Sequence, residues 1–232
     1  VVRRPRVAII ATGDELVLPG ETPGADQIVC SNPVGVAHLV RAFGGEPTFL
    51  GIARDTRQSL DDHIARAADC DVLVTLGGAS VGDHDLVGPV LKERGMALDF
   101  WKIAMRPGKP LMFGRLGPQF VLGLPGNPVS AMVTARIFLA PLVTALAGRP
   151  QLADKARLVP VSCALDANGP RAHYMRAVLS AGEDGATQVT PLASQDSSLV
   201  AMLAAASVLL VRPIGAAAVP PGTPVPVLDL DI

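Results

Sequence analysis

The sequence has few of the residues that mark a cross-linked, strongly charged or membrane-spanning protein. Its three cysteines (Cys30, Cys70 and Cys163) lie far apart and show no Cys-x-x-Cys spacing, so neither a disulfide framework nor a structural zinc is indicated. The 20 basic and 21 acidic residues nearly cancel, so no net field favours nucleic acid or an anionic membrane. The longest apolar run falls short of the roughly 20 residues of a spanning helix, and no signal peptide is visible. A reducing cytoplasm fits these absences best.

The first part of the chain alternates apolar β-rich runs with helical patterns, which predicts a doubly wound, mostly parallel α/β sheet. The predicted strands are Arg6–Ala11, Thr48–Ala53 and Val72–Leu76. The predicted helices run from about Ser31 to Phe43, from Leu60 to Ala68 with Ser59 as its cap, and from Leu86 to Arg94.

From Leu98 the pattern changes to a period of two, in which Trp101, Ile103 and Met105 alternate with Lys102, Ala104 and Arg106. A hairpin of Leu111–Gly114 with Phe120–Leu124 is expected next, followed by a helix that Pro141 kinks or restarts. After Gly148-Arg149-Pro150 only short β-like runs follow. We therefore expect an α/β domain over residues 1–150 and a small all-β domain over residues 151–232.

Glycine, serine and acids follow the most apolar strand directly, in Gly77, Gly78, Ser80, Gly82, Asp83 and Asp85. Ligands of open α/β sheets bind beyond the carboxyl ends of the strands, where this loop is expected to lie. The alternative is a tight strand-to-helix turn in which Asp85 only caps the helix.

Charged residues also follow the other predicted strands. Thr12-Gly13-Asp14-Glu15 follows the first, and Arg54-Asp55 the second. Lys102, Arg106 and Lys109 surround the turn Pro107-Gly108-Lys109-Pro110, and three cations suit a phosphate or another oxyanion. The alternatives are a solvated turn for the acids and a structural role for the cations. In the β region, Arg171, Arg176 and the segment Ser194–Ser198 are polar clusters that solvated turns explain better than ligand binding does.

Four motifs in this order resemble the molybdopterin molybdenumtransferase family, the MoeA type that is also found as the E domain of gephyrin. They are Thr12-Gly13-Asp14-Glu15-Leu16, Gly77-Gly78-Ala79-Ser80-Val81-Gly82-Asp83-His84-Asp85, Pro107-Gly108-Lys109-Pro110 and Leu124-Pro125-Gly126-Asn127-Pro128. Family members usually carry two further domains on the N-terminal side, so the resemblance implies a C-terminal portion, in which a molybdopterin-binding domain similar to the adenylyltransferases precedes a β domain.

The resemblance implies that adenylylated molybdopterin is hydrolysed with Mg²⁺ and that molybdate is inserted into its dithiolene. It also implies functional acids at Glu15, Asp55 and Asp85, which are the candidate metal ligands, and a functional lysine at Lys102. Arg106 stands where a lysine is common, and Ala79 where a valine is usual. The implied substrate-binding residues are Thr12, Gly13, Asp14, Asn32, Gly77, Gly78, Ser80, Gly82, Asp83, Arg106, Gly108, Lys109, Pro125, Gly126, Asn127 and Pro128.

Two other functions stay open at this point. The chain could catalyse the preceding adenylyl transfer to molybdopterin, or it could be a non-catalytic binding or oligomerisation module. The family likeness also implies a cytoplasmic homodimer that receives its substrate from the adenylyltransferase and passes its product to molybdoenzymes, without nucleic acid or membrane as a partner.

Overall fold

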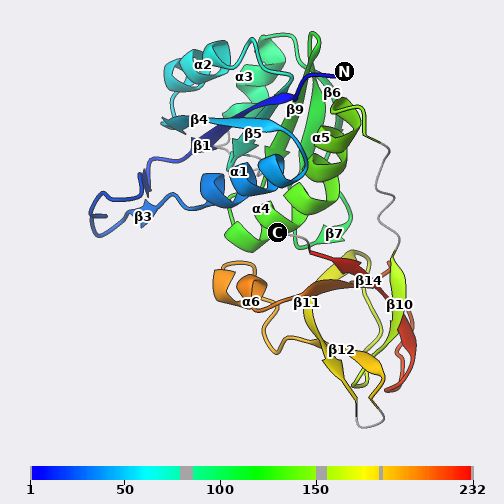
Figure 1. The fold of residues 1–232 in the computed structure, drawn as a ribbon. Helices are drawn as coiled ribbons and strands as arrows, with labels where there is room; N and C mark the ends of the chain where they lie inside the picture. The colour runs from blue at the N-terminus through cyan, green and yellow to red at the C-terminus, as the bar shows by residue number, and fades with distance from the viewer. Residues whose placement is uncertain (1, 79–85, 150–155, 183–184, 231–232) are drawn as a thin grey trace. The chain divides into compact units, whose positions relative to one another are not determined.

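A computed structural model describes residues 2–78, 86–149, 156–182 and 185–230 of the chain, which divides into two compact units. Unit 1 comprises Val1–Ile103 and Gly108–Gln151, and unit 2 comprises Ala104–Pro107 and Leu152–Ile232. Figure 1 shows both, with unit 1 in blue to green and unit 2 mostly in yellow to red.

Unit 1 is built on a six-stranded sheet in the order β4-β1-β5-β9-β8-β6. Strand β1 is parallel to its neighbours β4 and β5, and β5 is parallel to β9. Strand β8 is antiparallel to both β9 and β6. The strands are β1 (Arg6–Thr12), β4 (Glu46–Ala53), β5 (Val72–Leu76), β6 (Ala97–Trp101), β8 (Met112–Leu116) and β9 (Gln119–Leu124). All five residues of β5 are buried, as expected for a central strand that is covered on both faces.

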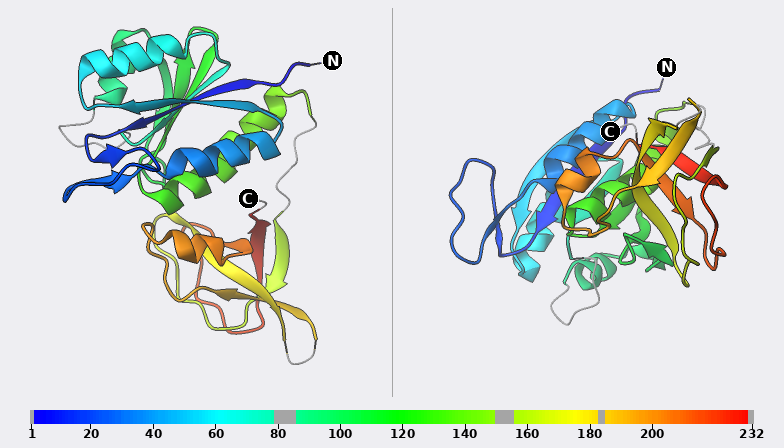
Figure 2. Two further views of the ribbon diagram at one scale, coloured as in Figure 1. Left: turned by 60° about the vertical axis from the view of Figure 1, so that its left-hand side comes forward. Right: turned by 90° about the horizontal axis from the view of Figure 1, so that it is seen from below.

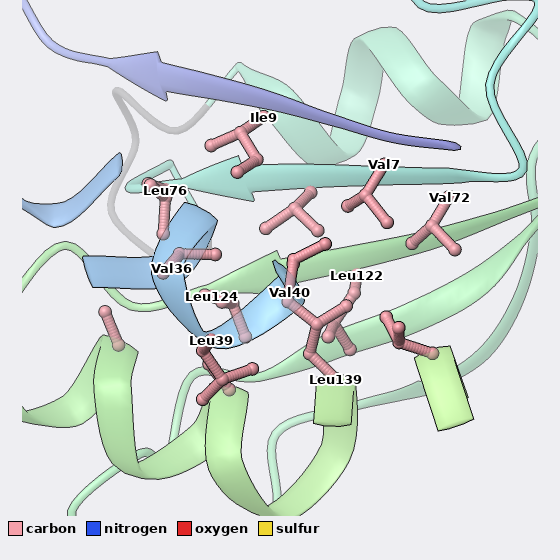
Figure 3. Packing of buried hydrophobic residues seen from close by; sticks show 14 of the residues in the cluster. Val7, Ile9, Val36, Leu39, Val40, Val72, Leu76, Leu122, Leu124 and Leu139 are labelled. Carbon is pink, nitrogen blue, oxygen red and sulfur yellow. The ribbon is translucent and has the colours of Figure 1, made fainter. Parts of the chain in front are cut away.

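Helices cover both faces of this sheet, which confirms the predicted doubly wound α/β class (Figure 2). One face packs against α1 (Asn32–Ala42) and a continuous helical segment of α4 (Pro128–Thr134), the π-helix η1 (Ala135–Leu139) and α5 (Ala140–Leu146). Figure 3 shows this core, in which Leu39 and Val40 of α1 belong to one cluster with Ile9, Leu122 and Leu139. The other face packs against α2 (Arg57–Arg66) and α3 (Val87–Glu93).

The α4–α5 segment, Pro128–Leu146, is long and apolar enough to cross a membrane by length and composition. However, 61% of its apolar window is buried inside the unit, which is how the core helix of a globular fold behaves. Its apolarity is explained by the core that it helps to form.

Two local predictions were wrong. The second helix is capped by Thr56, whose side chain accepts a hydrogen bond from the Ser59 amide, so it begins earlier than a Ser59 cap implies. The alternation after Leu98 is not one strand, because β6 ends at Trp101 and Lys102 takes a φ of 66°. The remaining alternating residues form β7 (Met105–Arg106), which pairs with a strand of unit 2.

Unit 2 is a small β structure with its own apolar core, as the sequence predicted. Its sheet has the order β10-β14-β13-β11-β12, with β7 added beside β11. The strands are β10 (Arg157–Pro160), β11 (Ala172–Ala181), β12 (Thr187–Pro191), β13 (Val208–Arg212) and β14 (Pro224–Asp229). The five-residue helix α6 (Val200–Ala204) and the two-residue strands β2 (Leu16–Val17) and β3 (Ile28–Val29) of unit 1 were not predicted.

Candidate functional site

The sheet of unit 1 brings most of the predicted motifs to one edge, which we call the rim. Strands β1, β4, β5 and β9 are parallel and end there. Strand β6 ends there too and β8 begins there, because β8 is antiparallel to both β6 and β9. The rim therefore carries Gly13–Glu15, Arg54–Asp55, Gly77–Gly78, Lys102, Lys109–Leu111 and Pro125–Asn127.

Charge changes sign along the rim. Asp14, Glu15 and Asp55 follow β1 and β4 at one end of the strand order, whereas Lys102 and Lys109 flank β6 and β8 at the other. Glycine and proline turns lie between them, after β5 and β9. With strands about 4.8 Å apart, three spacings separate β1 from β8, or roughly 14 Å. An elongated anion with a bound cation matches this distribution better than a compact one does.

The acidic end is held by its own backbone and by Arg54. The Gly13 amide donates to the Ala53 carbonyl at 3.2 Å, which ties the turn after β1 to the end of β4. Arg54 Nη1 donates to the Asp14 carbonyl at 3.1 Å, and the Asp55 amide donates to Asp14 Oδ1 at 3.2 Å. Asp14 therefore acts here as an acceptor that fixes Asp55, while Asp55 itself is exposed.

Glu15 folds back over its own turn. A Cβ added to Gly13 would lie 2.7 Å from Cδ of Glu15, so the glycine makes room for this carboxylate. Burial, together with the nearby Glu15 charge, raises the pKa of Cys30, so this thiol is kept protonated and unreactive.

The acids were expected to hold magnesium. Among the residues that the structure describes, no three acidic, histidine or cysteine side chains form a metal-holding group. Magnesium usually takes only one or two carboxylates and completes its shell with water and phosphate oxygens. The oxygen donors Glu15 and Asp55 therefore suit a Mg²⁺ ion that binds together with a phosphate ligand better than an ion that the protein holds alone.

The centre of the rim consists of closely packed backbone. The Gly77 amide donates to the Leu124 carbonyl at 3.1 Å, which joins the ends of β5 and β9. Gly77 has a φ of +94°, and a Cβ there would lie 2.9 Å from the carbonyl oxygen of Thr12. Asn32 Nδ2 donates to the Gly126 carbonyl at 2.7 Å, so this side chain anchors the turn after β9. Only glycine fits the close approach of residue 77 to the Thr12 main chain.

The basic end depends on a strained residue. Lys102 is the one non-glycine residue of the described chain with a positive φ. Its amide donates to the Leu111 carbonyl at 2.9 Å, and the next amide, of Ile103, donates to the Lys109 carbonyl at 3.0 Å. These bonds hold Lys102 and Lys109 side by side on the rim, and both side chains are exposed. Strain of this kind persists where the surrounding structure imposes it, often at functional sites.

The third predicted cation, Arg106, lies in unit 2 on β7, where it pairs with His173 of β11. The structure therefore does not place it in the same unit as Lys102 and Lys109. Ser80, Gly82, Asp83 and Asp85 lie outside the described residues.

Unit 2 contains an unexpected buried cation. Arg176 was predicted to lie on the surface, but its side chain is fully buried. Its Nη2 donates to the carbonyls of Ser194 and Asp196 at 3.3 and 3.1 Å, while Nε and Nη1 have no partner among the described residues. Burial, followed by the charge of Arg106, lowers the pKa of Arg176. The alternation along β11 predicts that the Arg176 side chain points away from the core of unit 2. It is buried there because the segment Ser194–Asp196 covers it, and no local pattern in the sequence indicates this cover.

His173 lies on the same strand and is partly buried. Burial, and then the charges of Arg106, Arg176 and Arg171, lower its pKa to about 4, so the imidazole is neutral at physiological pH. Its Nε2 is buried and has no hydrogen-bond partner in the part of the chain that the structure describes. Nearby cations and an unsatisfied ring nitrogen make this part of unit 2 a second place suited to an anion.

Comparison with known proteins identifies the family. The family described as "Probable molybdopterin binding domain" matches residues 8–145, and "MoeA C-terminal region (domain IV)" matches residues 159–230. The chain is 42% identical over 152 residues to a molybdopterin molybdenumtransferase of Nostoc sp., and this match covers 64% of this chain and 35% of that protein. It is 32% identical over 236 residues to molybdopterin molybdenumtransferase 2 of Mycobacterium tuberculosis, and this match covers 99% of this chain and 58% of that protein.

The crystal structure of a molybdopterin biosynthesis MoeA protein from Pyrococcus horikoshii has a similar fold. It superposes with a TM-score of 0.82 at 28% sequence identity, over 98% of this chain and 55% of that protein. The chain thus spans about a third to three fifths of the length of these relatives. Because the first family match alone covers more than half of the sequence, the chain belongs to the molybdopterin-binding family that includes the molybdopterin molybdenumtransferases, as its four motifs predicted.

Proposed function

We propose that the rim binds adenylylated molybdopterin and that the chain takes part in the Mg²⁺-dependent insertion of molybdate into this substrate. The observation that carries the proposal is the order of charge along one edge of unit 1, with acids over β1 and β4 and lysines at β6 and β8. Adenylylated molybdopterin is an elongated molecule, with a ring system at each end and a diphosphate between them. The relatives are named molybdopterin molybdenumtransferases, which supports a molybdopterin substrate.

Each part of the rim has a task in this proposal. Lys102 and Lys109 neutralise phosphate or molybdate oxygens, and the glycine turn after β5 lets the main chain approach the ligand. Glu15 and Asp55 hold Mg²⁺ together with phosphate oxygens, and the bound ion supplies charge neutralisation at the phosphoanhydride. Hydrolysis of that bond consumes one water and yields AMP and the pterin monophosphate.

Several further residues belong to the proposal by family resemblance. Asp85 is the third acid, and Pro125 and Pro128 line the place of molybdate. Arg106 is an additional group for anion binding, and Arg171 and the serines near Ser197 stand in the region where the β domain contributes residues. A homodimer, a cytoplasmic location and hand-over from the adenylyltransferase and to molybdoenzymes complete the proposal.

The test is turnover by the purified chain. Adenylylated molybdopterin is mixed with molybdate and Mg²⁺, and AMP release is followed by chromatography. We expect AMP release to require both molybdate and Mg²⁺, and its rate to fall at least tenfold in Asp55→Asn. The control is Asp69→Asn, which alters an exposed acid just before the start of β5, at the edge of the sheet opposite the rim, and should leave the rate unchanged.

Two alternative functions give different outcomes. If ATP and molybdopterin yield the adenylylated product, the chain is an adenylyltransferase. If adenylylated molybdopterin binds but no AMP appears, the chain is a binding module, and the catalytic part of the proposal fails.

A further inference from the structure

Trp101 is the single tryptophan of the chain and the last residue of β6, so it stands on the rim beside Lys102. Its side chain points to the α3 face, because Trp101 pairs with Met112, which belongs to the core on that face. The residue remains 37% exposed. Large aromatic side chains are usually buried more completely, and those that stay accessible at a site often bind ligand rings.

Lys102 adds a cation to this aromatic surface. The backbone of Lys102 has a φ of 66°, and its ammonium nitrogen lies 5.7 Å from the centroid of the Trp101 ring. The hydrogen bond from the Lys102 amide to the Leu111 carbonyl fixes the turn. An indole face and an ammonium group held this close match a ligand in which a flat heterocycle lies near a phosphate.

Gly88 of α3 lies beside one edge of the indole. A Cβ at this glycine would lie 3.9 Å from Cη2 of Trp101 and 4.0 Å from Sδ of Met112, which is ordinary contact. Alanine would therefore fit and would favour the helix, so packing alone does not require glycine here.

We infer that Trp101 stacks against one flat nitrogen heterocycle of the substrate while Lys102 binds the adjoining phosphate. This inference rests on the proposed function. Strands β6 and β5 are three spacings apart in the sheet, or roughly 14 Å, so a ligand stacked on Trp101 extends along the rim towards the Gly77 turn. The heterocycle is either the pterin or the adenine.

The experiment measures dissociation constants by calorimetry for AMP, for neopterin phosphate and for adenylylated molybdopterin. Trp101→Leu keeps an apolar side chain against Gly88 but removes the aromatic face, and Trp101→Phe restores a smaller one. Leu98→Ala alters another exposed apolar residue of β6 and serves as the control. Stacking of a base on an aromatic side chain corresponds to roughly a 5- to 150-fold change in affinity.

We expect Trp101→Leu to weaken adenylylated molybdopterin at least tenfold, with Trp101→Phe intermediate and Leu98→Ala unchanged. If Trp101→Leu also weakens the binding of AMP but not that of neopterin phosphate, the adenine stacks on Trp101. If it also weakens the binding of neopterin phosphate but not that of AMP, the pterin stacks there. Wild-type affinity of Trp101→Leu for adenylylated molybdopterin overturns the stacking inference and leaves the proposed function intact. If wild-type protein does not bind adenylylated molybdopterin at all, both fail.

Discussion

Replacing Gly77 by alanine tests whether the close approach of β1 and β5 shapes the rim. Gly77 has a φ of +94°, and an added Cβ would lie 2.9 Å from both the carbonyl oxygen and Oγ1 of Thr12. Gly95, with a φ of +91° and no atom of the described residues within 4 Å of its added Cβ, is a matched control. Both substitutions carry the backbone penalty, but only Gly77→Ala adds a clash with main chain.

The two contributions can be estimated separately. The left-handed conformation costs alanine about 1–2 kcal/mol, offset by about 0.4–1 kcal/mol of lost freedom in the unfolded chain. Gly95→Ala should therefore lower the free energy of unfolding by about 1 kcal/mol. Overpacking against Thr12 adds about 1–3 kcal/mol, so Gly77→Ala should lose about 2–4 kcal/mol in total.

Trp101 lies in unit 1, so its fluorescence during urea unfolding reports on that unit. With a slope of about 2 kcal/mol per molar urea, the midpoints of the two variants should differ by about 0.5–1.5 M. We also expect Gly77→Ala to bind adenylylated molybdopterin more weakly than Gly95→Ala does. Equal midpoints for the two variants would show that Thr12 does not restrict this position.

Three further predictions concern ionisable groups. Asp71→Ala should lower the free energy of unfolding by about 1 kcal/mol, because the Arg6 amide loses its acceptor. Arg3→Ala should lower it much less, because the ion pair between Arg3 and Asp71 is exposed. Urea unfolding measures both, and a larger loss for Arg3→Ala would contradict this prediction. The pKa of His173 is lowered to about 4 in the fold from an ordinary value of 6.5, so the unfolded chain binds more protons between these values. Stability should therefore be lost as pH falls from 6.5 towards 4, and His173→Gln should reduce this dependence in thermal melts at pH 7.5 and 5. Arg176→Met should keep or raise the melting temperature, because it removes a buried guanidinium of which only Nη2 is hydrogen-bonded among the described residues; a clear drop in melting temperature would assign Arg176 a structural role.

The sequence predicted the fold class because its apolar periodicity changes where the architecture changes. A strand such as Val72–Leu76, apolar throughout, has to be covered on both faces, and the structure buries every residue of it. The alternation from Leu98 to Arg106 was misleading, because a period of two does not reveal that Lys102 leaves the β region. Such a turn depends on hydrogen bonds to Lys109 and Leu111, which follow later in the sequence.

The candidate site was predicted through strand ends. Once β1, β4, β5 and β9 are parallel, the residues after them must share an edge, so the acidic and glycine turns could be placed together from the sequence. The burial of Arg176 could not be predicted in this way, because it depends on a distant segment, Ser194–Asp196, that folds over β11. Arg106 likewise follows Lys102 closely in the sequence but belongs to the other unit.

The most direct test of the account is the affinity of adenylylated molybdopterin for wild type, Asp55→Asn and Lys102→Gln, measured with and without Mg²⁺. If the opposite ends of the rim hold one elongated ligand, Lys102→Gln should weaken binding at least tenfold under both conditions, and Asp55→Asn should weaken it only when Mg²⁺ is present. Unchanged affinity in both variants would contradict the claim that acids and lysines of this rim bind the same molecule.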